Sequence, residues 1–540
     1  MNSDGAAFPR TDPEESHAEI DDPAPVSRVR PPVGPGVTVD EISRRTVVVE
    51  FAGARGGEAP LTWGQSSIWR LTTWRGDDDP YFNMPWVLPV YGRRDLGVVL
   101  GAVRRLVERH ETLRTNFRRG GGGMVQCVAR VGRLVVEVVE VAEGGGVGPM
   151  GVAREVAVGL AARVFDYAGE VPVRCAVVMV GGRPRAVAFG LSHLAVDGGA
   201  LDLLAADWRG LLAGVEGPDP VWQPMDQAIF EREGAGVERG ERAFRHWRAV
   251  LEGVPRSMFD YPPGLGEVPR FIRVRMESVA LGVAAEVLAA RWRVSSASVL
   301  TTASAVLLSV LTGHRRVVMQ LIAANRHDPR IGVLVGPAAQ DGIFALELPE
   351  GTLSEATRLG HRQALTAYRH ALYEPLRLMA MREELGRERG GPIDLSAYFN
   401  DTRGGGDWPD LPAVEPPGDP AAIAALTERT TFSPAGSWEH VDATTVQFIT
   451  GQARHTCELH LLADTAYLPR ATVHALLRGM ETLLVRAVAE DVPLDTVAAL
   501  CGITPVERPP GWERSRQGSA GETAQAPDAS GPVVAGTAGG

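Results

Sequence analysis

The segment with the clearest capacity for chemistry is Gly190-Leu-Ser-His-Leu-Ala-Val-Asp-Gly-Gly199. A strand is predicted to end near Leu191 and a helix to begin after Gly199, so His193 lies where the backbone leaves a sheet. Asp197 is a good helix N-cap, and Gly198 lets a ligand approach its backbone amide closely. A histidine with a pKa of about 6.5 can act as a base at neutral pH, and a helix N-terminus can stabilise an oxyanion. The pattern predicts acid–base chemistry centred on His193.

Two other interpretations of the same residues remain open. From spacing alone, His193 could be a core histidine beside a helix cap. The stretch Gly190-Leu-Ser-His-Leu194 is also most of the G-x-S-x-G motif of serine hydrolases, but its last glycine is missing. Adjacent side chains in an extended segment point in opposite directions, which disfavours activation of Ser192 by His193.

The elements around this segment alternate between strand and helix patterns. Val173–Val180 and Arg185–Leu191 are predicted as two strands of a hairpin turned by Gly181-Gly182. Apolar spacing also predicts further helices and strands. The predicted helices are residues 96–108, 152–165, 201–212, 227–250, 284–311 and 470–489, and the strands are residues 133–141, 317–323, 343–348, 446–449 and 456–462.

Composition narrows the possible functions. With 540 residues the chain is expected to form two or three packed units, and its net charge of -11 argues against nucleic acid or an anionic membrane as main partner. All 55 basic residues are arginine. The absence of lysine excludes a P-loop and Schiff-base chemistry, including that of pyridoxal phosphate. The four cysteines are far apart and no apolar leader is visible, so we expect a reduced, cytoplasmic protein.

A second motif, Arg109-His-Glu-Thr-Leu-Arg-Thr-Asn-Phe117, changes the interpretation. Together with Pro60-Leu-Thr-Trp-Gly-Gln-Ser-Ser-Ile-Trp-Arg70 and Ser192-His-Leu-Ala-Val-Asp-Gly198, it resembles the condensation domains of nonribosomal peptide synthetases. Further similar segments follow in the same order over roughly residues 58–505. They are Arg163–Tyr167, Trp222–Glu231, Ala324-Asn-Arg326 and Val335-Gly-Pro-Ala-Ala-Gln340.

The resemblance implies an α/β fold of two chloramphenicol-acetyltransferase-like lobes forming a V-shaped pseudo-dimer, with the active histidine in a tunnel between them. We therefore expect an N-terminal lobe at residues 56–220, a C-terminal lobe at residues 221–505, and disordered segments at residues 1–55 and 506–540. No carrier-type attachment serine is apparent, and lysine-dependent adenylation is excluded. We expect a stand-alone condensation enzyme without an intrinsic cofactor that meets its carrier proteins in trans.

The resemblance also implies residue roles. His193 matches the histidine that orients or deprotonates the attacking amine, and Gly198 matches the glycine whose amide faces the tetrahedral intermediate. Asp197 and Arg114 match a buried salt bridge that braces the loop. The first histidine of the family motif is Ser192 here, and the usual Asn-Thr after Val335-Gly336 is Gln340-Asp341.

The expected reaction joins an acyl or aminoacyl thioester, held on the phosphopantetheine of a partner carrier protein, to an amine. Two alternatives stay open. The same scaffold could form an ester or use a free acceptor, or it could be a non-catalytic relative that recruits a tailoring enzyme to a carrier protein. The substitution at Ser192 motivates the second alternative, whereas His193, Asp197 and Gly198 argue against it.

Three further patterns have simpler explanations. Gly146–Gly151 matches the dinucleotide fingerprint G-x-G-x-x-G, but no acidic residue ends a second strand, so a flexible loop is predicted. His455, Cys457 and His460 could suggest a metal, yet strand alternation separates His460 from the other two. The uncharged run Val294–Gly313 is predicted to be a buried core helix rather than a membrane span.

Overall fold

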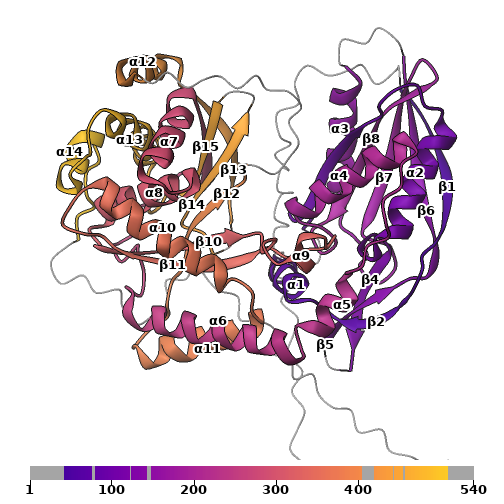
Figure 1. Cartoon of the computed structure of the whole chain (residues 1–540), viewed down its shortest axis with the longest axis horizontal. Coiled ribbons are helices and arrows are strands. Elements are labelled where there is room, and N and C mark those ends of the chain that lie inside the picture. Colours follow the sequence, from indigo (N-terminus) through magenta and orange to yellow (C-terminus); the bar gives the residue numbers. More distant parts are fainter. Residues whose placement is uncertain are drawn as a thin grey trace, which may run out of the picture. The chain divides into compact units, whose positions relative to one another are not determined.

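The computed structural model describes residues 42–75, 79–121, 123–142, 148–403, 419–441, 443–453 and 456–508. The early part of the chain builds one large sheet and the later part another. The predicted α/β class is confirmed, with helices packed on both sheets (Figure 1).

The first sheet has five strands in the order β1-β6-β7-β8-β3. All its neighbours are antiparallel except β6 and β7. Its strands are β1 (Ile42–Ala52), β3 (Asn83–Pro89), β6 (Val131–Val141), β7 (Val173–Val180) and β8 (Arg183–Ser192). The predicted hairpin is confirmed, because Gly181 and Gly182 both have positive φ angles (58° and 70°) and join β7 to β8.

Helices cover both faces of the first sheet. One core joins the sheet to α2 (Leu96–Arg109) and α4 (Gly198–Ala213), and another joins it to α3 (Pro149–Ala161). Val99, Val103 and Leu106 of α2 recur at helical spacing and are buried in the first core. A smaller three-stranded sheet adjoins this region, with α1 (Trp63–Arg75) and the 3₁₀ helix η2 (Glu111–Arg114). Its strands are β2 (Gly57–Pro60), β4 (Thr115–Gly120) and β5 (Gly123–Val128).

The second sheet has seven strands in the order β11-β10-β12-β14-β15-β9-β13. The pairs β10–β12 and β12–β14 are parallel, which gives this sheet a mixed topology. Its strands are β9 (Phe271–Ser278), β10 (Arg316–Ala323), β11 (Gln340–Glu347), β12 (Ala397–Asp401), β13 (Thr431–Trp438), β14 (Val446–Ala453) and β15 (Thr456–Asp464).

Ten further α-helices follow α4 in the described part of the chain, and one of them, α5, contacts β2 of the small sheet. They are α5 (Pro224–Phe230), α6 (Gly234–Gly253), α7 (Val279–Trp292), α8 (Ser296–Thr312), α9 (Pro329–Gly332), α10 (Leu353–Arg369), α11 (Pro375–Glu388), α12 (Pro420–Ala425), α13 (Arg470–Ala489) and α14 (Val497–Cys501). Two short 3₁₀ helices, η3 (Leu426–Arg429) and η4 (Leu494–Thr496), complete the set. Helices α7 and α8 form two elements where one was predicted, because Arg293 adopts a left-handed φ of 57° between them.

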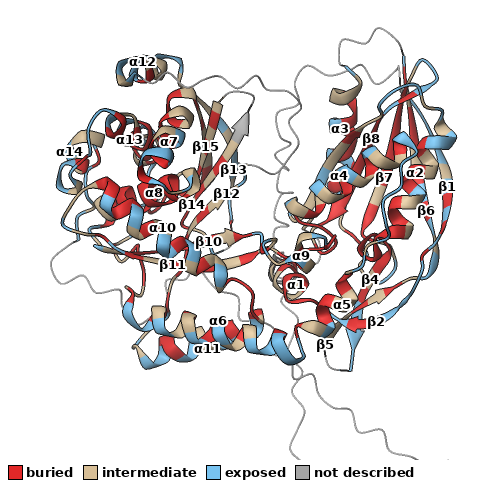
Figure 2. Ribbon diagram, in the orientation of Figure 1, coloured by how far each residue is buried: buried red, intermediate tan, exposed pale blue. Residues whose placement is uncertain are grey.

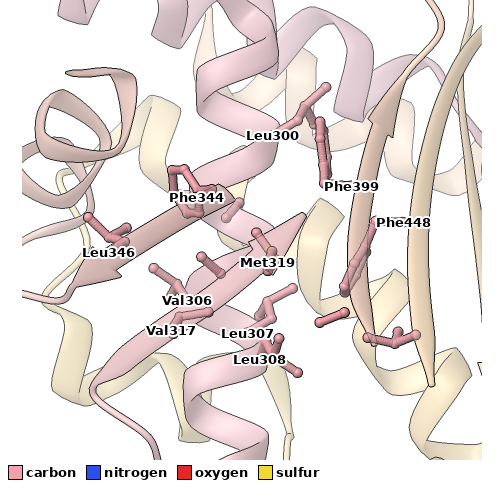
Figure 3. Close-up of a cluster of buried hydrophobic side chains, with 14 of the residues drawn as sticks. Leu300, Val306, Leu307, Leu308, Val317, Met319, Phe344, Leu346, Phe399 and Phe448 are labelled. Carbon is pink, nitrogen blue, oxygen red and sulfur yellow. The ribbon is translucent and has the colours of Figure 1, made fainter. Parts of the chain in front are cut away.

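Helix α8 is the centre of the second core. Its residues Leu300, Val306, Leu307 and Leu308 contact a group of side chains from β10, β11, β12 and β14 (Figure 3). Figure 2 shows α8 almost wholly buried, which confirms the predicted core helix. Among the described residues, no single helix has the length and apolar character needed to cross a membrane. Within that part of the chain, α7 and α8 pass the test as a pair, and they are bent by 105°.

The predicted boundaries of the disordered segments need correction. Residues 42–52 form β1, which pairs with β6 along its whole length, because the alternating run around Val47 and Val49 buries one face against α2. At the other end, the Val506 amide donates to the Leu311 carbonyl and Arg508 pairs with Asp260. Residues 1–41 and 509–540 lie outside the described residues, and the V-shaped arrangement of lobes stays a prediction.

Candidate active site

His193 lies in the turn that follows β8, as predicted. Its Nδ1 is 2.7 Å from the Val196 carbonyl oxygen. A carbonyl oxygen only accepts hydrogen bonds, so Nδ1 carries the proton and Nε2 keeps its lone pair. The His193 amide donates to the Phe82 carbonyl (3.1 Å), and the Phe82 ring lies against the imidazole with centroids 6.4 Å apart. The ring is therefore held in the tautomer that a general base requires.

Gly198 is the first residue of α4, next to this histidine in the loop. Asp197 is the N-cap, and its Oδ1 accepts from the Ala200 amide at 2.8 Å. Among the described residues, the Gly198 amide has no hydrogen-bond acceptor, and a Cβ built on Gly198 would meet no atom within 4 Å. The helix N-terminus thus carries an unpaired N–H group on an exposed residue, as an oxyanion-binding group must.

The Asp197 carboxylate is almost fully buried and accepts three further hydrogen bonds. Its Oδ1 is 2.5 Å from Nη2 of Arg326, and its Oδ2 accepts from the amides of Ala338 (2.8 Å) and Ala339 (3.1 Å). Four donors therefore surround one carboxylate, which points away from His193 to the segment before β11. Asp197 supports the loop and does not orient the imidazole.

Arg326, the partner of Asp197, also makes hydrogen bonds to the backbone. Its Nη1 donates to the carbonyls of Ile331 and Leu334 at 2.9 and 2.8 Å. Its side chain passes so close to Gly199 that a Cβ there would stand 2.0 Å from Nε of Arg326. The second glycine of the motif therefore makes room for this arginine.

The predicted pairing of Asp197 with Arg114 is wrong. Arg114 is buried, but its Nη1 donates to the carbonyls of Arg55 (2.7 Å) and Ala129 (2.6 Å). It packs over Gly53, where a Cβ would lie 2.3 Å from Cζ. Burial lowers the pKa of Arg114. Through these hydrogen bonds, Arg114 links the segment after β1 to the turn between β5 and β6.

The rest of the Arg109–Phe117 motif also has a structural role. Nε2 of His110 is 2.7 Å from Oδ2 of Asp207 on α4, and Nε of Arg109 is 3.2 Å from the same oxygen. These side chains join the end of α2 to α4, the helix that carries Gly198 at its start. The motif therefore braces the helix that carries Gly198.

Ser192, at the place of the family's first histidine, points away from His193. Its Oγ is 3.5 Å from the Tyr167 hydroxyl and accepts from the Leu194 amide at 3.2 Å. Tyr167 lines a cavity of about 370 Å³ together with Trp69, Phe117, Phe165 and other residues. No hydrogen bond joins Ser192 to His193 in the described part of the chain, so the serine-hydrolase arrangement is absent there.

The described residues contain no group of three or more His, Cys, Asp and Glu side chains placed to hold a metal. His455 lies outside them, and Nε2 of His460 is 3.3 Å from the Glu458 carboxylate. Most of the glycine-rich segment at residues 144–148 also lies outside the described residues, and Gly148 is the N-cap of α3.

Sequence reasoning missed Arg326 and the two amides that hold Asp197. A signal was present, because Ala324–Arg326 and Val335–Gln340 were among the segments that resemble the family, but neither suggested a partner for Asp197. Asn325 completes this arrangement. It has a left-handed φ of 58°, and its Nδ2 donates to the Ala338 carbonyl at 2.8 Å.

Known proteins match both the sequence and the fold. The family model of the condensation domain matches residues 56–374, more than half of the chain. The chain is 25% identical over 298 residues to surfactin synthase subunit 2 of Bacillus subtilis, and 31% identical over 217 residues to a probable non-canonical nonribosomal peptide synthetase of Salinispora arenicola. The matches cover 54% and 38% of this chain but only 8% and 3% of those proteins.

Solved structures show the same fold. The condensation domain of the monacolin K polyketide synthase superposes with a TM-score of 0.62 at 18% identity, covering 81% of this chain and 98% of that one. The first condensation domain of the calcium-dependent antibiotic synthetase gives 0.57 at 17% identity, covering 84% and 99%. An X-domain solved in complex with OxyB from teicoplanin biosynthesis gives 0.58 at 17%, covering 83% and 97%. By its matched residues, its fold and the loop that carries His193, this chain belongs to the condensation domain family of nonribosomal peptide synthesis.

Proposed function

We propose that the chain forms an amide bond between an acyl or aminoacyl thioester on a carrier protein and an amine acceptor. One observation carries the proposal: Nδ1–H of His193 is bonded to the Val196 carbonyl, which leaves Nε2 to accept a proton, and the Gly198 amide in the same loop has no hydrogen-bond partner in the described part of the chain. A base and an oxyanion donor in one loop are what acyl transfer needs.

The proposed reaction proceeds by addition and elimination at the thioester carbonyl. The amine nitrogen attacks the carbonyl carbon, and the Gly198 N–H stabilises the negative charge that develops on oxygen. Nε2 of His193 accepts the proton of the amine. The carbon–sulfur bond then breaks, and the proton passes to the departing thiolate, which leaves the phosphopantetheine arm as a free thiol and the product as an amide.

The test is intact-protein mass spectrometry of an acyl-loaded carrier protein mixed with the chain and a panel of amines and alcohols. We expect loss of the acyl group from the carrier, matched by a new amide. His193→Ala should slow this conversion about a hundredfold to ten-thousandfold, the usual contribution of one acid–base group. His474→Ala, which removes a half-buried histidine on α13, is the matched control and should react like the wild type.

A recruitment role is the second candidate, and Ser192 favours it. The family's first histidine is absent, and the X-domain solved with OxyB has the same fold. Carrier protein that binds the chain yet stays loaded with every acceptor, in wild type and His193→Ala alike, would support recruitment and contradict catalysis. Formation of an ester with alcohols only would instead show that the scaffold prefers hydroxyl acceptors.

A further inference from the structure

The cavity of about 370 Å³ that Tyr167 lines is not used by any step of the proposed reaction. Its walls come from α1, from the hairpin of β4 and β5, and from residues 164–168 after α3. Sites for small molecules are usually hollows of about 300 to 1,000 Å³ with mainly apolar and aromatic walls and a few polar groups. This cavity has that size, and its apolar lining residues are Trp69, Phe117, Met124, Val164, Phe165 and Tyr167.

Tyr167 joins the aromatic wall of this cavity to the active-site motif. Its ring is edge-on to Trp69 (5.6 Å between centroids, 74° between planes) and to Phe117 (6.3 Å, 80°), and it is stacked with Phe165 (6.4 Å, 29°). Its hydroxyl is 3.5 Å from Oγ of Ser192. Aromatic rings prefer edge-to-face and offset contacts, so a wall built in this way offers such contacts to a further ring.

Two strand ends place the cavity beside the loop that carries His193. Asn83, at the start of β3, lines the cavity and is paired in register with Ser192 at the end of β8. Phe82, the residue before Asn83, packs its ring against the imidazole of His193 with centroids 6.4 Å apart. On both strands, therefore, a residue in contact with the cavity wall is the direct neighbour of His193 or of the ring that holds it.

The serine at position 192 leaves this space open. The family's motif has a histidine here, and an imidazole is longer than the hydroxymethyl group of serine. Because Oγ of Ser192 already lies 3.5 Å from the Tyr167 hydroxyl, a histidine ring in the same direction would displace Tyr167 or fill part of the cavity. The departure from the family motif thus gives this chain room beside its active-site loop.

The size and the charge of the cavity indicate what it holds. An apolar cavity of about 150 Å³ binds benzene, so one of about 370 Å³ has room for two fused rings. The charged residues that line it are two arginines and two aspartates (Arg118, Arg119, Asp79 and Asp166), so they offer no net charge to a ligand. A neutral aromatic group therefore fits better than an ionised acid or amine, whose charge would lose its hydration.

We propose that this cavity binds an aromatic acyl group of about two rings, carried by the thioester donor. An acyl group held as a thioester has no carboxylate charge, whereas an amine acceptor is cationic at neutral pH. The inference rests on the proposed condensation reaction for the identity of the donor, but binding itself requires no turnover.

The test is isothermal titration calorimetry of the full chain with the N-acetylcysteamine thioesters of 2-naphthoic, octanoic and acetic acid and with 2-naphthylmethylamine, each titrated alone. We expect the naphthoyl thioester to bind about tenfold to a hundredfold more tightly than the acetyl thioester, the factor that burial of one large apolar side chain provides. Equal affinity for these two would overturn the proposal. So would tighter binding of the octanoyl thioester, which would assign the cavity to alkyl chains, or of the amine, which would assign it to the acceptor.

Two substitutions narrow the cavity from different sides. Val164→Phe enlarges one lining side chain, and Ser192→His adds an imidazole beside Tyr167. Each should weaken binding of the naphthoyl thioester about tenfold or more and leave the affinity for the acetyl thioester unchanged, a selective loss that misfolding would not produce. Val158→Phe, at a position on α3 that is 46% exposed, is the matched control for Val164→Phe and should bind like the wild type. Unchanged binding by both cavity variants, or an equal loss in Val164→Phe and Val158→Phe, would contradict the assignment.

The two proposals fail in different ways. If the naphthoyl thioester binds and both cavity variants weaken it, but no acyl group leaves a loaded carrier, only the condensation reaction is wrong. If acyl transfer proceeds at the same rate from naphthoyl- and acetyl-loaded carriers, and Val164→Phe changes neither rate, the cavity does not serve the donor while the reaction stands.

Discussion

The Asp197 carboxylate is 2.5 Å from the Arg326 guanidinium, although the two residues are 129 positions apart in the sequence. The pair joins the N-terminus of α4, beside the loop that carries His193, to the residues between β10 and β11. Because Asp197 also caps α4 and accepts two amides before β11, one side chain couples the position of Gly198 to the second sheet.

This coupling predicts a large loss of stability on breaking the pair. Arg326→Ala leaves a buried carboxylate without its cation and should lower the free energy of unfolding by about 3 to 5 kcal/mol, measured by urea denaturation. In a double-mutant cycle, Asp197→Asn and Arg326→Ala should show a strong interaction energy. Asp197→Asn and Arg114→Ala should instead be additive, because the Arg114 guanidinium donates to the carbonyls of Arg55 and Ala129 and not to Asp197. Coupling between Asp197 and Arg114 would contradict the structure.

The Gly198 amide can be removed without disturbing the helix. Proline is well tolerated at the first helical position, and Asp197 before it has extended angles (φ −117°, ψ −178°) that proline accepts in its predecessor. Gly198→Pro should therefore fold normally but lose about a hundredfold to thousandfold in acyl-transfer rate, as expected for one oxyanion donor. Gly198→Ala keeps the N–H group, its Cβ would meet no atom within 4 Å, and the variant should remain close to wild type. Equal rates for the two variants would show that the amide takes no part.

The neighbouring glycine should behave in the opposite way. Gly199→Ala places a Cβ 2.0 Å from Nε of Arg326, so the arginine must move and its pairing with Asp197 must weaken. We expect a loss of about 1 to 3 kcal/mol in stability, typical of overpacking, together with lower activity. Thermal denaturation of Gly198→Ala and Gly199→Ala side by side provides the check, and similar melting temperatures would argue against this close contact.

A buried glutamate predicts a pH dependence of stability. Glu231 accepts from the Trp63 amide at the start of α1 (2.7 Å) and from Gln227 (2.8 Å), and burial raises its pKa to about 7. The folded state therefore binds this proton more tightly than the unfolded chain does. The stabilisation from the protonated Glu231 is therefore fully present below the unfolded-state pKa of about 4.3. It declines as the pH rises above that value and is lost once the pH passes the folded-state pKa of about 7, which lowers the free energy of unfolding by about 3 kcal/mol at most.

Urea denaturation at pH 5, 6, 7 and 8 tests whether the free energy of unfolding falls as the pH rises. The wild type should lose stability across the series, and Glu231→Gln, which carries no titrating proton, should show a flatter profile. A steeper decline in the variant than in the wild type would mean that Glu231 is ionised in the folded protein throughout this range.

Local features of the fold were predictable because their causes lie within a few residues. Gly181-Gly182 specifies a two-residue hairpin turn, Asp197 is a cap for the helix directly after it, and the apolar run at residues 294–313 forms the buried helix α8. His193 and Gly198 were placed in their loop by the same short-range reasoning. The strand at residues 42–52 was missed because its partner, β6, begins almost 80 residues later.

Tertiary structure alone decided which arginine meets Asp197. Arg114 and Arg326 both lie in segments that resemble the family, and nothing in their local sequence states which guanidinium will reach the carboxylate. The folded structure decides the pairing. Arg114 donates to two backbone carbonyls and packs over Gly53, whereas Gly199 leaves room for Arg326 beside Asp197. The sequence by itself determined the histidine, its loop and the helix cap, since these depend on neighbouring residues, whereas the charge pairs around them depend on contacts between distant parts of the chain.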